Sequence, residues 1–236
     1  MRRICIIQSA YIPWRGFFDL IDRCDEYVIL DGAQFVKGHW QNRNRVRGPA
    51  GPTWLSIPVV TADRLGQSIE DVRVSDRGWA QTHWRKLATY YADAPFFAAM
   101  GPTLQALFED AGRCERLTEI NEILMRGIAG LLGIETTFVR DTIYDPQGMR
   151  TDRVVDICIK AGATHYLTGP SARVYLDETP FMEAGIAVEW MSYPAYTPYP
   201  QGAHPYDPAL SIIDLLLNAG PGREDLWRGR AQAEAT

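Results

Sequence analysis

The sequence predicts an α/β fold, with a Rossmann-like, partly parallel sheet and a helical subdomain. Short apolar runs alternate with amphipathic segments along most of the 236 residues, and the chain opens with the strand–loop–helix–strand order of a βαβ unit. Apolar residues make up 46% and charged residues 22% of the chain, as in ordinary globular domains. We therefore expect one α/β domain over residues 1–220 with a helix-rich insertion at about 79–132, followed by a polar tail at 221–236.

The first βαβ unit covers the start of the chain. Residues 4–8 form an apolar run that predicts a short buried strand. Over residues 16–24 the apolar side chains recur at helical spacing, which predicts a helix. A second strand is expected at 26–31, where Gly32 ends it.

The later elements follow from the same periodicities. Further strands are expected at 53–60, 69–74, 136–140, 164–168 and 187–192, and helices at 79–91, 102–111, 116–132, 152–161 and 179–184. Residues 193–206 predict an ordered loop, because four tyrosines would be wasted in solvent. Asp207-Pro208 supplies an N-cap and a first-turn proline for a helix that runs through Asn218, and the tail beyond 221 is expected to fray.

Charge and composition exclude several classes of partner. The net charge is −5 and the only basic cluster is residues 42–47, which suits a small phosphate or carboxylate better than nucleic acid. No apolar run approaches the roughly 18 residues that span a bilayer, so we expect no membrane contact and a cytoplasmic location. The four cysteines and four histidines are scattered, which predicts reduced thiols and no metal site.

Polar or glycine-rich sequence follows three of the expected strands, at residues 8–14, 31–34 and 167–171. Ligands of open α/β sheets bind beyond the carboxyl ends of strands, so these segments could share one cleft. In loop 9–15, Tyr11 and Trp14 could form a rigid wall for a sugar or nucleobase, with Gly16 opening the helix toward an anion. The alternative is a proline-stiffened turn with packed aromatic rings.

Segment 31–45 contains nearly every polar group type, and two aromatic residues that are costly to expose, Phe35 and Trp40. One interpretation is a solvated hairpin. The other is a binding strand, which accounts better for the mixture of side chains. In it, Lys37 and Arg43 would hold a phosphate, while Gln34, Asn42 and Asn44 would fix hydroxyl groups.

His83 is the histidine considered first as a catalytic group. It shares a helix face with Trp79, Leu87 and Tyr90, so it is either a core histidine satisfied by a neighbour or a general base. His39, His165 and His204 are weaker candidates. Asn121 lies on an apolar helix face and must hydrogen-bond to backbone or ligand.

Several motifs together resemble the WbqC-like protein family over roughly residues 4–220. The most specific stretches are Gln8-x-x-Tyr11-x-Pro13-Trp14-x-Gly16-Phe17-Phe18-Asp19 and Asp31-x-x-Gln34-Phe35-x-Lys37-x-x-Trp40-x-Asn42-Arg43-Asn44, and Leu167-x-Gly169 with Tyr175-Leu176 matches further on. The chain departs from the family at Ser9, where proline is common, and at Gly32, where an acidic residue is frequent. The resemblance implies a role in O-antigen, related sugar or natural-product pathways, as an aminoacyltransferase acting on an amino sugar.

The sequence and the resemblance together favour an acyl- or aminoacyltransferase whose acceptor is an amine, on a nucleotide-linked amino sugar or natural-product intermediate. The donor would be a thioester of coenzyme A or of an acyl carrier protein. Alternatives are an ATP-dependent ligase or hydrolase using the same cleft, or a non-catalytic pathway binding protein, and a homo-oligomer is one option. His83 and Asp31 are the catalytic candidates. The residues expected to bind substrate are Gln8, Tyr11, Trp14, Gln34, Lys37, Trp40, Asn42, Arg43, Asn44, Gly169, Ser171 and Tyr175.

Overall fold

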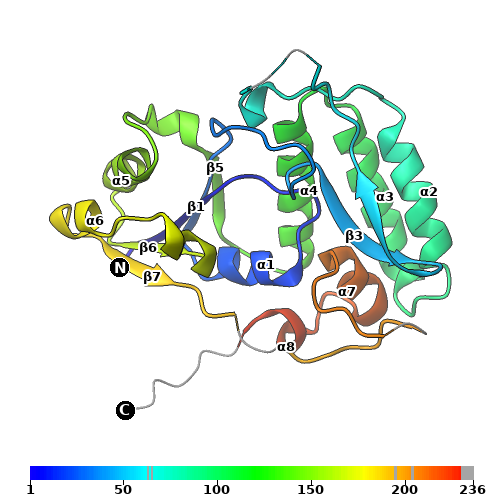
Figure 1. The fold of residues 1–236 in the computed structure, drawn as a ribbon. Coiled ribbons are helices and arrows are strands. Elements are labelled where there is room, and N and C mark those ends of the chain that lie inside the picture. The colour runs from blue at the N-terminus through cyan, green and yellow to red at the C-terminus, as the bar shows by residue number, and fades with distance from the viewer. Residues whose placement is uncertain (63, 65, 194–195, 203–204, 230–236) are drawn as a thin grey trace.

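Five strands form the central sheet of the protein (Figure 1). The computed structural model describes residues 1–62, 64, 66–193, 196–202 and 205–229. The strands are β1 (Arg3–Ile7), β2 (Glu26–Ile29), β5 (Thr137–Arg140), β6 (His165–Thr168) and β7 (Ala187–Trp190), in the order β5-β2-β1-β6-β7. All four strand pairs are parallel, so the α/β class is confirmed and the sheet is more regular than the partly parallel one expected.

Helices cover both faces of this sheet, and adjacent residues of β2 show why. Tyr27 belongs to one apolar cluster, with residues of α1 (Arg15–Asp22) and α4 (Leu117–Leu131). Val28 points to the other face and joins a second cluster, with residues of α5 (Thr151–Lys160) and α6 (Thr179–Glu183). Every residue of β2 is buried, as is typical of a parallel strand covered on both sides.

The path of the chain creates a switch point beside β1. From β1 the chain moves outward on one side, to β2 and then β5, before it crosses back to β6 and β7 on the other side. The loops that follow β1 and β6 therefore leave the sheet toward opposite faces. In doubly wound sheets such a point forms a crevice at the carboxyl ends of the strands.

A second body of structure lies against this sheet. It contains the antiparallel hairpin of β3 (Arg43–Gly48) and β4 (Gly51–Ser56), the helices α2 (Trp79–Tyr90) and α3 (Phe97–Gly112), and α7 (Ile212–Ala219). Figure 1 shows α2, α3 and α4 side by side, with α4 nearest the sheet. No helix in the described part of the chain is both long and apolar enough to cross a membrane.

Several local predictions were wrong. The strand expected at 69–74 is a short 3-10 helix, Ile69–Asp71, followed only by isolated bridges at Arg73 and Val74. The strand expected at 53–60 ends at Ser56 and pairs with β3 outside the main sheet, and the helix expected at 102–111 begins at Phe97. Helix α7 is capped by Ser211, which accepts a hydrogen bond from the Ile213 N–H, rather than by Asp207.

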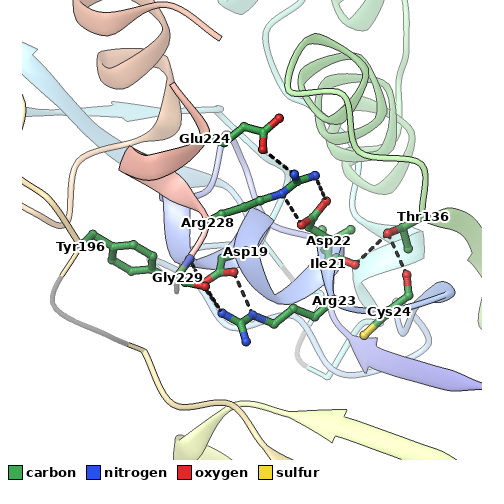
Figure 2. A network of polar contacts seen from close by, with 10 residues as sticks. All are labelled: Asp19, Ile21, Asp22, Arg23, Cys24, Thr136, Tyr196, Glu224, Arg228 and Gly229. Carbon is green, nitrogen blue, oxygen red and sulfur yellow. Dashed lines mark hydrogen bonds and ion pairs between the residues drawn. The ribbon is translucent and has the colours of Figure 1, made fainter. Parts of the chain in front are cut away.

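The C-terminal segment is packed rather than frayed over residues 224–229. Helix α8 (Glu224–Trp227) buries Leu226 and Trp227 almost completely. Arg228 then forms a bidentate ion pair with Asp22 of α1, at 2.6 and 2.7 Å. Figure 2 shows the neighbouring contact, in which Asp19 accepts hydrogen bonds from Arg23 and from the Gly229 N–H. Residues 230–236 lie outside the described part of the chain.

We expect Trp227→Ala to lower the free energy of unfolding by about 3–5 kcal/mol, because a fully buried indole leaves a cavity when it is truncated. Urea unfolding followed by circular dichroism measures the loss. Met149→Ala is the matched control, since that side chain is 79% exposed. A loss no larger than that of the control would show that the C-terminal segment is not part of the folded core.

Candidate functional site

A pocket of about 350 Å³ opens at the carboxyl end of β1, beside the switch point. The loop after β1 forms one wall, and the segment that leads into β3 forms the opposite wall. The surface of the pocket is mainly apolar, with a few polar groups, which is the usual composition of a small-molecule site. The lining residues are Ile7, Gln8, Ser9, Ala10, Pro13, Trp14, Phe17, His39, Trp40, Gln41, Asn44 and Ala209.

A chain of amide contacts orients the polar groups of the pocket. The Val36 N–H donates to Gln41 Oε1 at 3.0 Å, so Gln41 Nε2 faces Gln8 and donates to its Oε1 at 2.7 Å. This arrangement leaves Gln8 Nε2 without a hydrogen-bond partner among the described residues. The side-chain amide of Asn121 supports the same part of the pocket, because it donates hydrogen bonds to Ser9 Oγ and to the Gln41 carbonyl. Asn121 thus bonds to protein groups, one of the two outcomes left open above.

Asp31 lies just beyond β2 and holds the loop that follows β1. Its Oδ1 accepts a hydrogen bond from the Ser9 N–H at 2.8 Å. Burial raises the pKa of Asp31 above its ordinary value, although the hydrogen bond from the Ser9 N–H opposes the rise. Asp31 is 3% exposed and does not line the pocket, so the structure gives it a positioning geometry.

Asn44 fixes the most strained part of the loop. Ile12 has a φ of 37°, in the left-handed region that β-branched residues avoid at a cost of about 1–3 kcal/mol. Asn44 Nδ2 donates to the carbonyls of Tyr11 and Ile12 at 3.1 and 2.9 Å, while its Oδ1 accepts from the Arg45 N–H. The amide of Asn44 is therefore committed to the loop rather than to a substrate. Asn42 is likewise buried and bonded to the Ile57 carbonyl.

Trp14 forms a side wall of the pocket, and Gly16 explains the position of its ring. Its ring lies over Gly16, where an added Cβ would come within 2.4 Å of the indole. Tyr193 and Tyr196 contact the ring edge-on, with centroids 5.1 and 5.9 Å away. Gly16 thus makes room for an indole instead of opening the helix toward an anion, and α1 begins one residue earlier, at Arg15.

A cage of tyrosines surrounds the buried guanidinium of Arg15. The rings of Tyr196, Tyr199 and Tyr206 lie 4.8, 5.5 and 5.8 Å from it. Its Nη1 donates to the carbonyls of Thr197 and Leu226, and Nη2 donates to the Tyr206 hydroxyl. These three tyrosines are thereby held next to Arg15, the residue after the pocket residue Trp14.

The structure does not bring His83 to the pocket. His83 is 4% exposed, and its Nδ1 lies 2.7 Å from the Tyr11 hydroxyl, which is also buried. Burial and the charge of Lys86 lower the pKa of His83 to about 4, although a hydrogen bond to the Ser56 backbone opposes this. These contacts fit the interpretation of a core histidine satisfied by its neighbours.

Three of the predicted binding residues that follow β6 lie outside the pocket lining. Ser171 and Tyr175 are exposed, Tyr175 by 73%. Gly169 is closer, because a Cβ built on it would lie 3.7 Å from the Tyr193 hydroxyl. Gln34 and Lys37 are exposed as well and lie outside the lining.

His39 and Gln41 are two of the polar lining residues that sequence reasoning undervalued or missed. Both belong to segment 31–45. The weak signal for them was their position on either side of Trp40, among the family motif residues. Within the described ranges, His39 is the only histidine that lines the pocket; His204 lies outside those ranges. The described residues of the chain contain no cluster of three or more potential metal-binding side chains.

A model of the WbqC-like protein family matches residues 8–225. The chain belongs to this family. Among curated relatives, the uncharacterized protein Rv1507c of Mycobacterium tuberculosis (strain H37Rv) is 38% identical to this WbqC-like protein over 228 residues, which covers 97% of this chain and 98% of the relative. No solved structure gives a significant match.

We expect Asn44→Ala to lower the free energy of unfolding by at least about 2 kcal/mol, because it leaves two buried carbonyls unpaired. It should also speed hydrogen exchange at the Tyr11 amide, which bonds to the Trp40 carbonyl. Asn42→Ala is the comparison, since it removes a buried amide outside the loop. Unchanged exchange at Tyr11 in Asn44→Ala would contradict the bracing role.

The pKa of His83 makes stability depend on pH. Because the folded value of about 4 lies below the usual 6.5, the unfolded state takes up the proton more readily. The stabilisation is complete above pH 6.5 and is lost as pH falls toward 4, by roughly 3 kcal/mol. An NMR titration of the imidazole should show His83 neutral down to about pH 4. Titration of His83 near pH 6.5 would argue for a solvated side chain.

Proposed function

We propose that this WbqC-like protein is an acyl- or aminoacyltransferase acting on an amine acceptor, such as a nucleotide-linked amino sugar or a natural-product intermediate. The observation that carries the proposal is the pocket at the switch point, where a histidine and an amide donor without a partner among the described residues face a mainly apolar chamber. The four cysteines of the protein form no disulfide bond, which favours a cytoplasmic enzyme.

The apolar walls suit the acyl part of a donor, and the polar groups suit the reacting carbonyl. Ile7, Pro13 and Phe17 supply an apolar surface for an acyl chain. Gln8 Nε2, held by the contact between Gln41 and Gln8 Oε1, can donate a hydrogen bond to the carbonyl oxygen. A fixed donor aimed at this oxygen stabilises the negative charge that develops during attack.

In this proposal His39 replaces His83 as the general base. The acceptor nitrogen attacks the carbonyl carbon of a thioester, from coenzyme A or a carrier protein, and His39 takes the amine proton. The C–N bond forms, the C–S bond breaks, and the proton passes to the leaving thiolate. Asp31 and Asn44 position the pocket loop and take no part in the proton transfer.

The alternatives use the same pocket and are separated by product analysis. A ligase would form product only with ATP, and a hydrolase would release free acid without an acceptor. A binding protein would show calorimetric binding of thioesters or amino sugars without any product. Acyl-coenzyme A incubated with amino-sugar nucleotides, with and without ATP, and followed by mass spectrometry distinguishes these outcomes.

We expect His39→Ala to lower kcat by about 10²–10⁴-fold, the usual contribution of a general base, with little change in substrate binding. Mass-spectrometric product formation over time measures the rate. His165→Ala is the matched control, because His165 lies at the start of β6, away from the pocket. Full turnover in His39→Ala would remove His39 from the mechanism.

A further inference from the structure

The outward face of the β3–β4 hairpin carries a row of cations beside the pocket. Along β3, Asn44 and Val46 are buried, while Arg43, Arg45 and Arg47 alternate with them and are half-buried. Trp54 on β4 pairs with Arg45 in the hairpin register and is 41% exposed. The alternation of the strands thus places three guanidinium groups and an indole on one surface.

Only one of these three arginines lacks a polar partner in the described part of the chain. Arg45 forms an ion pair with Asp207 at 3.3 Å, and Arg47 donates to the backbone carbonyls of Gln201 and Tyr90. The guanidinium of Arg43 makes no hydrogen bond or ion pair with a described residue, and its buried Nε is unsatisfied. Its guanidinium instead lies 4.3 Å from the ring centroid of Trp54.

The indoles join this surface to the pocket. Trp40 lines the pocket and is 44% exposed, and its ring centroid lies 5.5 Å from that of Trp54, with an interplanar angle of 35°. Gly38 approaches Arg43, since a Cβ built on it would lie 3.4 Å from the guanidinium carbon. Lys37 is therefore in the turn next to Arg43. We call Lys37, Trp40, Arg43 and Trp54 the outer ledge.

We propose that the outer ledge binds the nucleoside phosphate part of a substrate whose reacting end enters the pocket. A planar base can stack on the exposed indoles, and the phosphates can meet Arg43 and Lys37. A neutral sugar would leave both cations unmatched, and an inorganic anion would leave the indoles unused. This assignment rests on the proposed function for the direction of the reaction, but its test reads binding alone.

The size of the pocket supports a division of the substrate between two subsites. A volume of about 350 Å³ lies near the lower end of the roughly 300–1,000 Å³ found for small-molecule sites. The pocket can therefore hold the reacting end, while a nucleotide needs surface outside it. Trp40 belongs to both subsites, and its neighbour His39 lines the chamber where the transfer would occur.

A nucleotide could come from either substrate, and two probes separate the sources. Coenzyme A carries an adenine nucleotide on the donor, and uridine diphosphate represents a nucleotide-linked acceptor. Isothermal titration calorimetry of the full chain with each probe, at low ionic strength, measures Kd. Inorganic phosphate and uridine test whether the anion or the ring suffices alone.

We expect one of the two nucleotides to bind more tightly than phosphate or uridine. Trp54→Ala should raise its Kd about tenfold, because it removes a stacking surface, and Trp54→Phe should restore part of the affinity. Arg43→Gln should raise Kd by a similar factor and reduce the dependence of binding on salt. Arg85→Gln, an exposed arginine of α2 outside the ledge, should leave Kd unchanged.

The outcomes separate this inference from the proposed function. Absence of binding by both nucleotides overturns the ledge assignment, and so does unchanged affinity in both Trp54→Ala and Arg43→Gln. Nucleotide binding that depends on the ledge, together with full turnover in His39→Ala, would leave the ledge in place and remove the proposed base. Loss of turnover in His39→Ala without nucleotide binding would remove only the ledge.

Discussion

The site depends on the contact between the amide of Asn44 and the carbonyls of Tyr11 and Ile12. The pocket has two walls that belong to different parts of the fold, the loop after β1 and the segment leading to β3. Asn44 holds them together, and the hydrogen bond from the Tyr11 N–H to the Trp40 carbonyl adds to the same join. The strain at Ile12 can persist because these contacts and complete burial over-determine its conformation.

Buried carboxylates near this join accept hydrogen bonds from tyrosine hydroxyls. Asp214 accepts hydrogen bonds from the hydroxyls of Tyr91 and Tyr199, at 2.8 Å each, and burial raises its pKa. Tyr196 donates in the same way to Asp19 of α1, as Figure 2 shows. Each hydroxyl takes the place of water on a buried carboxylate, and Asp19 is paired with Arg23 as well.

The regular part of the fold could be predicted from the sequence because its signals are local. The apolar runs of β1 and β2 and the helical spacing of α2 and α4 correspond closely to the expected ranges. The errors arose where tertiary contacts decide. Asp207-Pro208 has the chemistry of a helix start, yet Asp207 pairs with Arg45, and Ser211 caps α7.

The site was predicted less completely than the fold, for a physical reason. Residue types in segment 31–45 indicated a binding surface, but one sequence cannot say which amides are used internally. Asn42 and Asn44 carry the right chemistry for a ligand, and the structure commits both to backbone carbonyls. His83 sits on a helix face that faces the core, whereas His39 lies in an irregular segment without periodicity to mark it.

The docking of α8 has a consequence for biosynthesis. Arg15, at the start of α1, donates to the carbonyl of Leu226, a residue 211 positions further along the chain. While the protein is being translated, this guanidinium cannot reach its final partners until the chain has been synthesised beyond Leu226. The chamber beside Trp14 therefore matures only after all five strands of the sheet have been synthesised, and a chain released before Leu226 would carry an unfinished site.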